Sequence, residues 1–171
     1  AYLFYKNFPD SNIYSYEPVY KFYKILNVLV SEINNNEKTT CLIHPINKGV
    51  GDGNYSKELS QSYYSKSNGY SARLDDEYES LHRNNLGLIK IDVEGMESLI
   101  IENAQNTIKK YKPVLVIAIY HRPEDFFEMK DKLRTLNPDY KFLIRRSGIA
   151  YPDVEIVLIA YNDVQSNEVK N

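Results

Sequence analysis

The sequence contains no tryptophan, a single cysteine and no apolar run long enough to cross a membrane. Because Cys41 has no partner, an intrachain disulfide and a cysteine metal cluster are excluded, and a reducing cytoplasm is the simplest expected compartment. The longest apolar run begins at Val114 and has the length of a strand, well below the roughly 20 residues of a membrane-spanning helix. The 21 basic and 23 acidic residues nearly cancel, so neither a nucleic-acid nor a membrane partner is expected.

Segments with strand character alternate with segments of helical periodicity along the 171 residues. Strands are predicted at 13–18, 40–46, 86–92, 112–121, 140–146 and 155–161, and helices at 19–33, 72–85, 96–108 and 122–136. This alternation predicts one α/β domain over residues 1–171, with a mostly parallel sheet and helices on both faces. The residues between the last two strands are too few for a helical crossover, so these strands should pair antiparallel.

The helical segments carry apolar residues at regular spacing, which predicts their buried faces. In the segment 96–108 the expected core positions recur every four residues: Met96, Ile100, Ala104 and Ile108. In the segment 19–33 they are Val19, Phe22, Tyr23, Leu26, Val30 and Ile33, and in the segment 122–136 they are Phe126, Lys130, Leu133 and Leu136 or its neighbours. The segment 47–70 is rich in Gly, Ser, Asn and Tyr and is predicted to be a loop or irregular hairpins.

Titratable residues follow three of the predicted parallel strands. The strand beginning at Ile13 ends at Glu17. The strand predicted at 86–92 ends at Asp92, with Glu94 just beyond, and the strand predicted at 112–121 ends at His121. Ligands of open parallel sheets bind at the carboxyl ends of the strands, so we expect these side chains to share one rim. Carboxylates there could face a cationic cofactor or hold a substrate hydroxyl, and the imidazole of His121 could accept the proton of that hydroxyl.

Each of these residues also has a purely structural interpretation. Asp92 could cap the following helix, and Glu94 could favour the helix N-terminus, the role that we predict for Glu97. His121 could cap the next helix or bond to a backbone carbonyl, and Glu17 could be an ordinary acid in a turn. No metal site is predicted, with convergence of Asp92, Glu94 and His121 on one ion as the lesser alternative.

Two longer motifs indicate a family. The run IKIDVEGMESLIIENA at 89–104 and the run YHRPEDFFEM at 120–129 together resemble the FkbM-type methyltransferases, a branch of the Rossmann-like enzymes that use S-adenosylmethionine. IYSYEP at 13–18 is similar to the second strand of that family, and the closing strand pair is similar as well. The resemblance extends over nearly the whole chain.

The resemblance implies methyl transfer from S-adenosylmethionine to a hydroxyl of a sugar, a polyketide or another small molecule. Glu17 and Pro18 would then hold the cofactor ribose, and Glu94 would also help to bind the cofactor. Asp92 would lie beside the sulfonium and the acceptor, and His121 would be the general base. The first strand of the family and its glycine loop do not precede Ala1, so we expect a domain truncated at its N-terminus.

Two other functions are compatible with the same residues. One is a truncated or degenerate Rossmann-like domain with a non-catalytic role in binding or assembly. The other is an NAD-dependent oxidoreductase, since an acid after the second strand also suits that cofactor. The glycine-rich fingerprint of such an oxidoreductase is absent from the sequence.

Overall fold

The protein is described by a computed structural model that covers residues 6–8, 10–36, 42–54, 71–80, 85–146 and 155–163. The chain divides into two compact units, Ala1–Arg73 and Leu74–Asn171. Most of the loop expected at 47–70 and the link between the last two strands lie outside the described residues. No helix among the described residues is long and apolar enough to cross a membrane.

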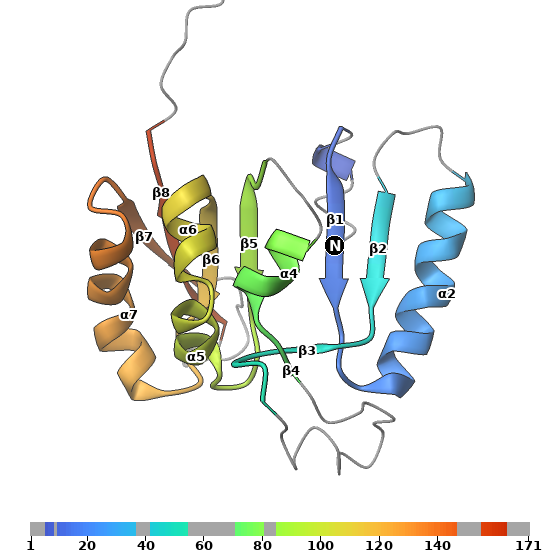
Figure 1. The fold of residues 1–171 in the computed structure, drawn as a ribbon, viewed down its shortest axis with the longest axis horizontal. Coiled ribbons are helices and arrows are strands. Elements are labelled where there is room, and N and C mark those ends of the chain that lie inside the picture. Colours follow the sequence, from blue (N-terminus) through green and yellow to red (C-terminus); the bar gives the residue numbers. More distant parts are fainter. Residues whose placement is uncertain are drawn as a thin grey trace, which may run out of the picture. The chain divides into compact units, whose positions relative to one another are not determined.

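The first unit is built on a strand–helix–strand motif. The strands β1 (Asn12–Tyr16) and β2 (Leu42–Ile46) pair in parallel, and α2 (Tyr20–Asn36) connects them (Figure 1). Val30 of α2 and Ile43 of β2 are buried against each other, with Ile13, Leu26 and Ile33 packed around them. A second parallel pair, β3 (Gly49–Val50) with β4 (Ser71–Ala72), was not predicted, because two residues carry no readable periodicity.

The predicted apolar stripe of α2 is correct at its centre and wrong at its edge. Val30 is buried, and Leu26 and Ile33 pack beside it, whereas Phe22 is 51% exposed. On a helical projection Phe22 lies about 80° from Val30. A two-stranded sheet covers only a narrow stripe of a helix, so Phe22 falls outside it.

The second unit contains a four-stranded sheet in the order β5-β6-β8-β7. Its elements are α4 (Leu74–Ser80), β5 (Leu88–Ile91), α5 (Glu97–Glu102), α6 (Gln105–Tyr111), β6 (Val114–Ala118), α7 (Pro123–Leu136), β7 (Lys141–Arg146) and β8 (Ile156–Tyr161). The neighbours β5 and β6 run parallel, while β8 is antiparallel to both β6 and β7. The predicted antiparallel pairing of the last two strands is therefore confirmed.

The core of the second unit is formed by the sheet and the helices α5, α6 and α7, which Figure 1 shows in front of it. Its most buried apolar side chains include Ile101, Ile108, Leu115, Ile117, Met129, Leu133 and Leu158. Tyr140 closes one end of this core, where its buried hydroxyl donates a hydrogen bond of 2.6 Å to the carbonyl of Pro113. Burial raises the pKa of Tyr140 to about 12, so the hydroxyl keeps the proton that this bond requires.

The single helix predicted over 96–108 is broken into α5 and α6 because Asp75 inserts into its hydrogen-bond ladder. The backbone N–H of Asp75 donates to the carbonyl of Asn103 at 3.1 Å. Its carboxylate accepts hydrogen bonds from the backbone N–H groups of Asn106 and Thr107, at 3.2 and 2.8 Å. In an unbroken helix Thr107 would donate to Asn103, so Asp75 replaces one intrahelical bond and caps α6.

The predicted buried face of α7 is correct at Leu133 and wrong at Phe126 and Lys130. Asp125, Met129 and Leu133 are buried, whereas Phe126 is 43% exposed and Lys130 is also exposed. Phe126 was predicted to be buried because its side chain is hydrophobic. The buried face instead includes Asp125, whose carboxylate accepts a hydrogen bond of 2.8 Å from the hydroxyl of Ser98 in α5. The predicted start of the helix at Pro123 is correct.

Candidate functional site

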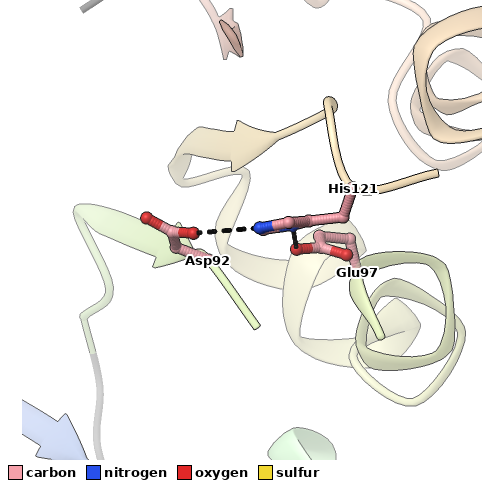
Figure 2. A group of neighbouring side chains, drawn as sticks. All are labelled: Asp92, Glu97 and His121. Carbon is pink, nitrogen blue, oxygen red and sulfur yellow. Dashed lines mark hydrogen bonds and ion pairs between the residues drawn. The ribbon is translucent and has the colours of Figure 1, made fainter. Parts of the chain in front are cut away.

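Three side chains meet where β5 and β6 end. Asp92 directly follows β5, His121 follows β6, and Glu97 begins α5 (Figure 2). Because β5 and β6 are adjacent parallel strands, with Ile91 opposite Ile117, their carboxyl ends lie at the same edge of the sheet. Asp92, Glu97 and His121 each offer one possible metal-ligand atom, and these atoms lie within 4.8 Å of one another.

A tight turn between β5 and α5 shapes this cluster. Glu94 and Gly95 both have left-handed backbone conformations, with φ angles of 55° and 97°. A Cβ atom at Gly95 would lie 3.3 Å from the Cγ and Cδ atoms of Arg122. Gly95 therefore permits both the turn and the close approach of the segment after β6, which brings His121 next to α5.

Glu97 fixes the orientation of the His121 ring. Its Oε1 atom lies 2.7 Å from Nδ1 of His121 and accepts a second hydrogen bond from the backbone N–H of Val93 at 3.0 Å. The Glu97 side chain is completely buried. An ionised carboxylate can only accept, so Nδ1 carries the hydrogen, and the lone pair of the neutral ring is on Nε2.

The Nε2 atom of His121 faces the two other carboxylates without a hydrogen bond. It lies 3.9 Å from Oδ1 of Asp92 and 3.6 Å from Oε2 of Glu94, beyond the usual reach of an N–H···O bond. The His121 side chain is only 9% exposed. The other oxygen of Asp92 is bonded to the ammonium of Lys90 at 2.9 Å, so Oδ1 is the atom that faces His121.

Tyr120 adds an aromatic side chain beside the cluster. Its ring centroid lies 4.1 Å from that of His121, and the two rings are inclined by 46°. Burial, and secondarily the charges of Asp92 and Glu94, raise the pKa of Tyr120 above its usual value. The phenol is therefore a hydrogen-bond donor at neutral pH.

The structure brings together Asp92, Glu94 and His121 as the sequence predicted. Glu17 also lies at the predicted strand end, where its Oε1 accepts a hydrogen bond of 2.7 Å from the backbone N–H of Val19. Glu17 and Pro18 belong to the first compact unit, so their place on a rim shared with Asp92 stays a prediction. His44 stacks on the ring of Tyr14 in the first unit.

Glu97 is the site residue that the sequence interpretation missed. It does occupy the helix N-terminus assigned to it, but its side chain points to His121 (Figure 2). The signal was present, because Glu97 precedes Ile100, Ile101 and Ala104 by three, four and seven residues. These intervals place the acid on the buried face of the helix, where an unpaired carboxylate is very costly.

A comparison with protein families matches the model of the methyltransferase FkbM domain to residues 1–144. The chain belongs to the FkbM methyltransferase domain family. Enzymes of this family use S-adenosylmethionine. The match agrees with the two motifs in the sequence and does not support the alternative of an NAD-dependent oxidoreductase.

The fold resembles that of a crystal structure of methyltransferase FkbM from Methylobacillus flagellatus KT. The TM-score is 0.68 at 20% sequence identity, and the match covers 88% of this chain. It covers 36% of the other chain, so this chain spans about a third of that relative. The comparison with curated proteins finds no significant match.

Proposed function

We propose that this chain is a catalytic domain that transfers the methyl group of S-adenosylmethionine to a hydroxyl oxygen of a small molecule. The observation that carries this proposal is the cluster at the ends of β5 and β6. There, a buried imidazole oriented by Glu97 presents Nε2 toward Asp92 and Glu94. Together with membership of the FkbM family, this arrangement supports activation of an acceptor at Nε2.

The proposed fold is a single Rossmann-like methyltransferase domain over 1–171, with a mostly parallel sheet covered by helices on both faces. The parallel pairs β1–β2 and β5–β6 support it, as does the position of β8 between β6 and β7. In such a sheet Glu17 and Pro18 would follow the strand that holds the cofactor ribose. The bond from Val19 to Glu17 supports this role, because it fixes the carboxylate at the strand end.

In the proposed reaction the acceptor oxygen attacks the methyl carbon in line with the departing sulfur. S-adenosylmethionine would supply the methyl group and would leave as a neutral thioether when its C–S bond breaks, and the proton of the acceptor hydroxyl would pass to Nε2 of His121. Asp92 and Glu94 provide negative charge near the sulfonium, and Nε2 of His121 is where the acceptor hydroxyl is activated. Positioning of the two reactants supplies much of the rate in a displacement of this kind.

The acceptor class within this proposal is a hydroxyl-bearing small molecule, with a carbohydrate as one possibility. Tyr120 beside His121 supports a ring-shaped acceptor, because an aromatic face packs well on the apolar face of a sugar. The segment 47–70 is proposed to contribute to the choice of acceptor.

Calorimetric titration of the purified protein with S-adenosylmethionine tests the cofactor assignment. We expect saturable binding that Glu17→Ala weakens about 10- to 100-fold, the effect of losing charge-assisted hydrogen bonds to the ribose. Glu32→Ala, at an exposed acid of α2 in the same unit, is the matched control and should bind normally. Unchanged affinity in Glu17→Ala would remove the ribose assignment, and absence of binding in the unaltered protein would favour the non-catalytic alternative.

A further inference from the structure

The geometry around Nε2 of His121 points to a metal site. We propose that Nε2 of His121, Oδ1 of Asp92 and Oε2 of Glu94 bind one divalent transition-metal ion, with Glu97 as the outer carboxylate that orients the histidine. This inference departs from the sequence prediction, in which a metal was the lesser alternative. It deepens the proposed function, because the ion would lie where the acceptor hydroxyl is activated.

The two distances from Nε2 of His121 to the carboxylate oxygens of Asp92 and Glu94 fit ligands of one ion better than hydrogen-bonded partners. The separations of 3.6 and 3.9 Å between Nε2 and the two carboxylate oxygens exceed hydrogen-bond length. Two ligands that are each about 2.1 Å from a tetrahedral ion lie about 3.4 Å apart. Movement of an exposed carboxylate by a few tenths of an ångström would reach this spacing, and Glu94 is 91% exposed.

The burial of His121 provides a second, independent observation. Its side chain is 9% exposed, and its Nε2 atom is buried with no hydrogen-bond partner in the structure. An unpaired buried polar atom costs about 1–3 kcal/mol, so an orphan nitrogen aimed at two carboxylates requires an explanation. A cation bound to all three groups satisfies the nitrogen and compensates the negative charge.

Glu97 supplies the interaction that usually accompanies a metal-bound histidine. Such histidines almost always donate their second ring N–H to a carboxylate, a carbonyl or a water, which fixes the tautomer and raises the basicity of the ligand. Here Nδ1 donates to Glu97 at 2.7 Å, and the lone pair of the neutral ring is on Nε2. The ring is thus held in the tautomer that a metal requires.

The ligand types narrow the choice of ion. One imidazole with two carboxylates suits Mn²⁺, Fe²⁺, Co²⁺ or Zn²⁺, whereas Mg²⁺ and Ca²⁺ prefer oxygen ligands alone. In the proposed reaction the ion would bind the acceptor oxygen and lower the pKa of its hydroxyl, and the proton would leave to solvent before the methyl group arrives. Nε2 would then be a ligand, so this route replaces direct proton transfer to His121.

Titration of chelator-treated protein with Co²⁺, followed by visible absorption, tests the site. We expect one bound ion per chain, with affinity reduced at least tenfold in Asp92→Asn and also lowered in Glu94→Gln. Both side chains are partly or largely exposed, so neither substitution threatens the fold. Glu128→Gln, at an exposed acid of α7 in the same unit, is the control and should bind Co²⁺ normally.

A second variant tests the outer carboxylate. Glu97→Gln should weaken Co²⁺ binding about 10- to 100-fold, as expected for loss of the group that orients a metal-bound histidine. Circular dichroism verifies that this variant is folded. No saturable Co²⁺ uptake, or uptake indifferent to Asp92→Asn and Glu94→Gln, would overturn the metal site. Titration of the metal-free protein with S-adenosylmethionine separates this failure from that of the proposed function: saturable binding there keeps the cofactor assignment whatever the result with Co²⁺.

Discussion

Carboxylate groups face both ring nitrogens of His121. A buried carboxylate holds Nδ1 at 2.7 Å, and two more accessible carboxylates face Nε2 at 3.6 and 3.9 Å. The carboxyl groups of Asp92 and Glu94 beside Nε2 are the surroundings in which we propose that a cation binds. A single side chain therefore links the fold of α5 to the proposed chemistry.

The turn that brings His121 to Glu97 depends on a residue without a side chain. We predict that Gly95→Ala lowers the free energy of unfolding by about 1–2 kcal/mol, because a left-handed φ is unfavourable for alanine and its Cβ would press on Arg122. Gly87→Ala is the control, since its Cβ would meet no atom within 4 Å. Urea unfolding measures both. Equal stabilities of the two variants would contradict the constraint at Gly95.

At the scale of elements, the capping of α6 from α4 joins segments that are about thirty residues apart. Asp75 accepts hydrogen bonds from the first turn of α6, including one of 2.8 Å from Thr107. The backbone N–H of Asp75 also donates to the carbonyl of Asn103 at the end of α5, so α4 is bonded to both helices at their junction.

We predict that Asp75→Ala lowers the free energy of unfolding by about 1–2 kcal/mol, the usual cost of losing a helix cap. Asp75→Asn is the conservative variant and should lose much less, because its amide oxygen can still accept the bond from Thr107. Thermal or urea unfolding compares the two. If the alanine and asparagine variants were equally stable, the carboxylate would not be acting as a cap.

At the scale of the whole molecule, the sheet of the second unit combines a parallel and an antiparallel part. The central strands β6 and β8 carry the buried side chains, among them Leu115 and Leu158, while β7 lies at the edge with Leu143 and Ile144 exposed. The strands that position the site are therefore supported by the best-packed part of this unit.

Two leucines on the neighbouring strands β8 and β7 test whether the central strands carry the core of this unit. Leu158→Ala should lower the free energy of unfolding by about 2–5 kcal/mol, because Leu158 is 2% exposed and its loss leaves a cavity. Leu143→Ala on β7 should cost about 1 kcal/mol or less, because Leu143 is 37% exposed. Urea denaturation of both variants is the measurement. Similar losses of unfolding free energy in the two variants would contradict the assignment of Leu158 to the core.

Much of the secondary structure could be predicted because it depends on local patterns. Alternating and continuous apolar runs correctly indicated β1, β2 and β5–β8, and Pro123 correctly indicated the start of α7. Two of the errors occurred where a polar side chain takes part in the packing of a helix. Asp75 divided the predicted helix at 96–108, and Asp125 belongs to the buried face of α7, whereas Phe126 is exposed.

The sequence by itself determined the α/β class, the FkbM resemblance and the placement of Asp92, Glu94 and His121 after strands, since each follows from residue order and spacing. Only the tertiary structure decided that Glu97 serves His121 and that Nε2 faces two carboxylates. The physical reason is that both facts depend on the parallel pairing of β5 with β6 and on the turn at Gly95. These features join residues about 25 positions apart, beyond the range of any local pattern.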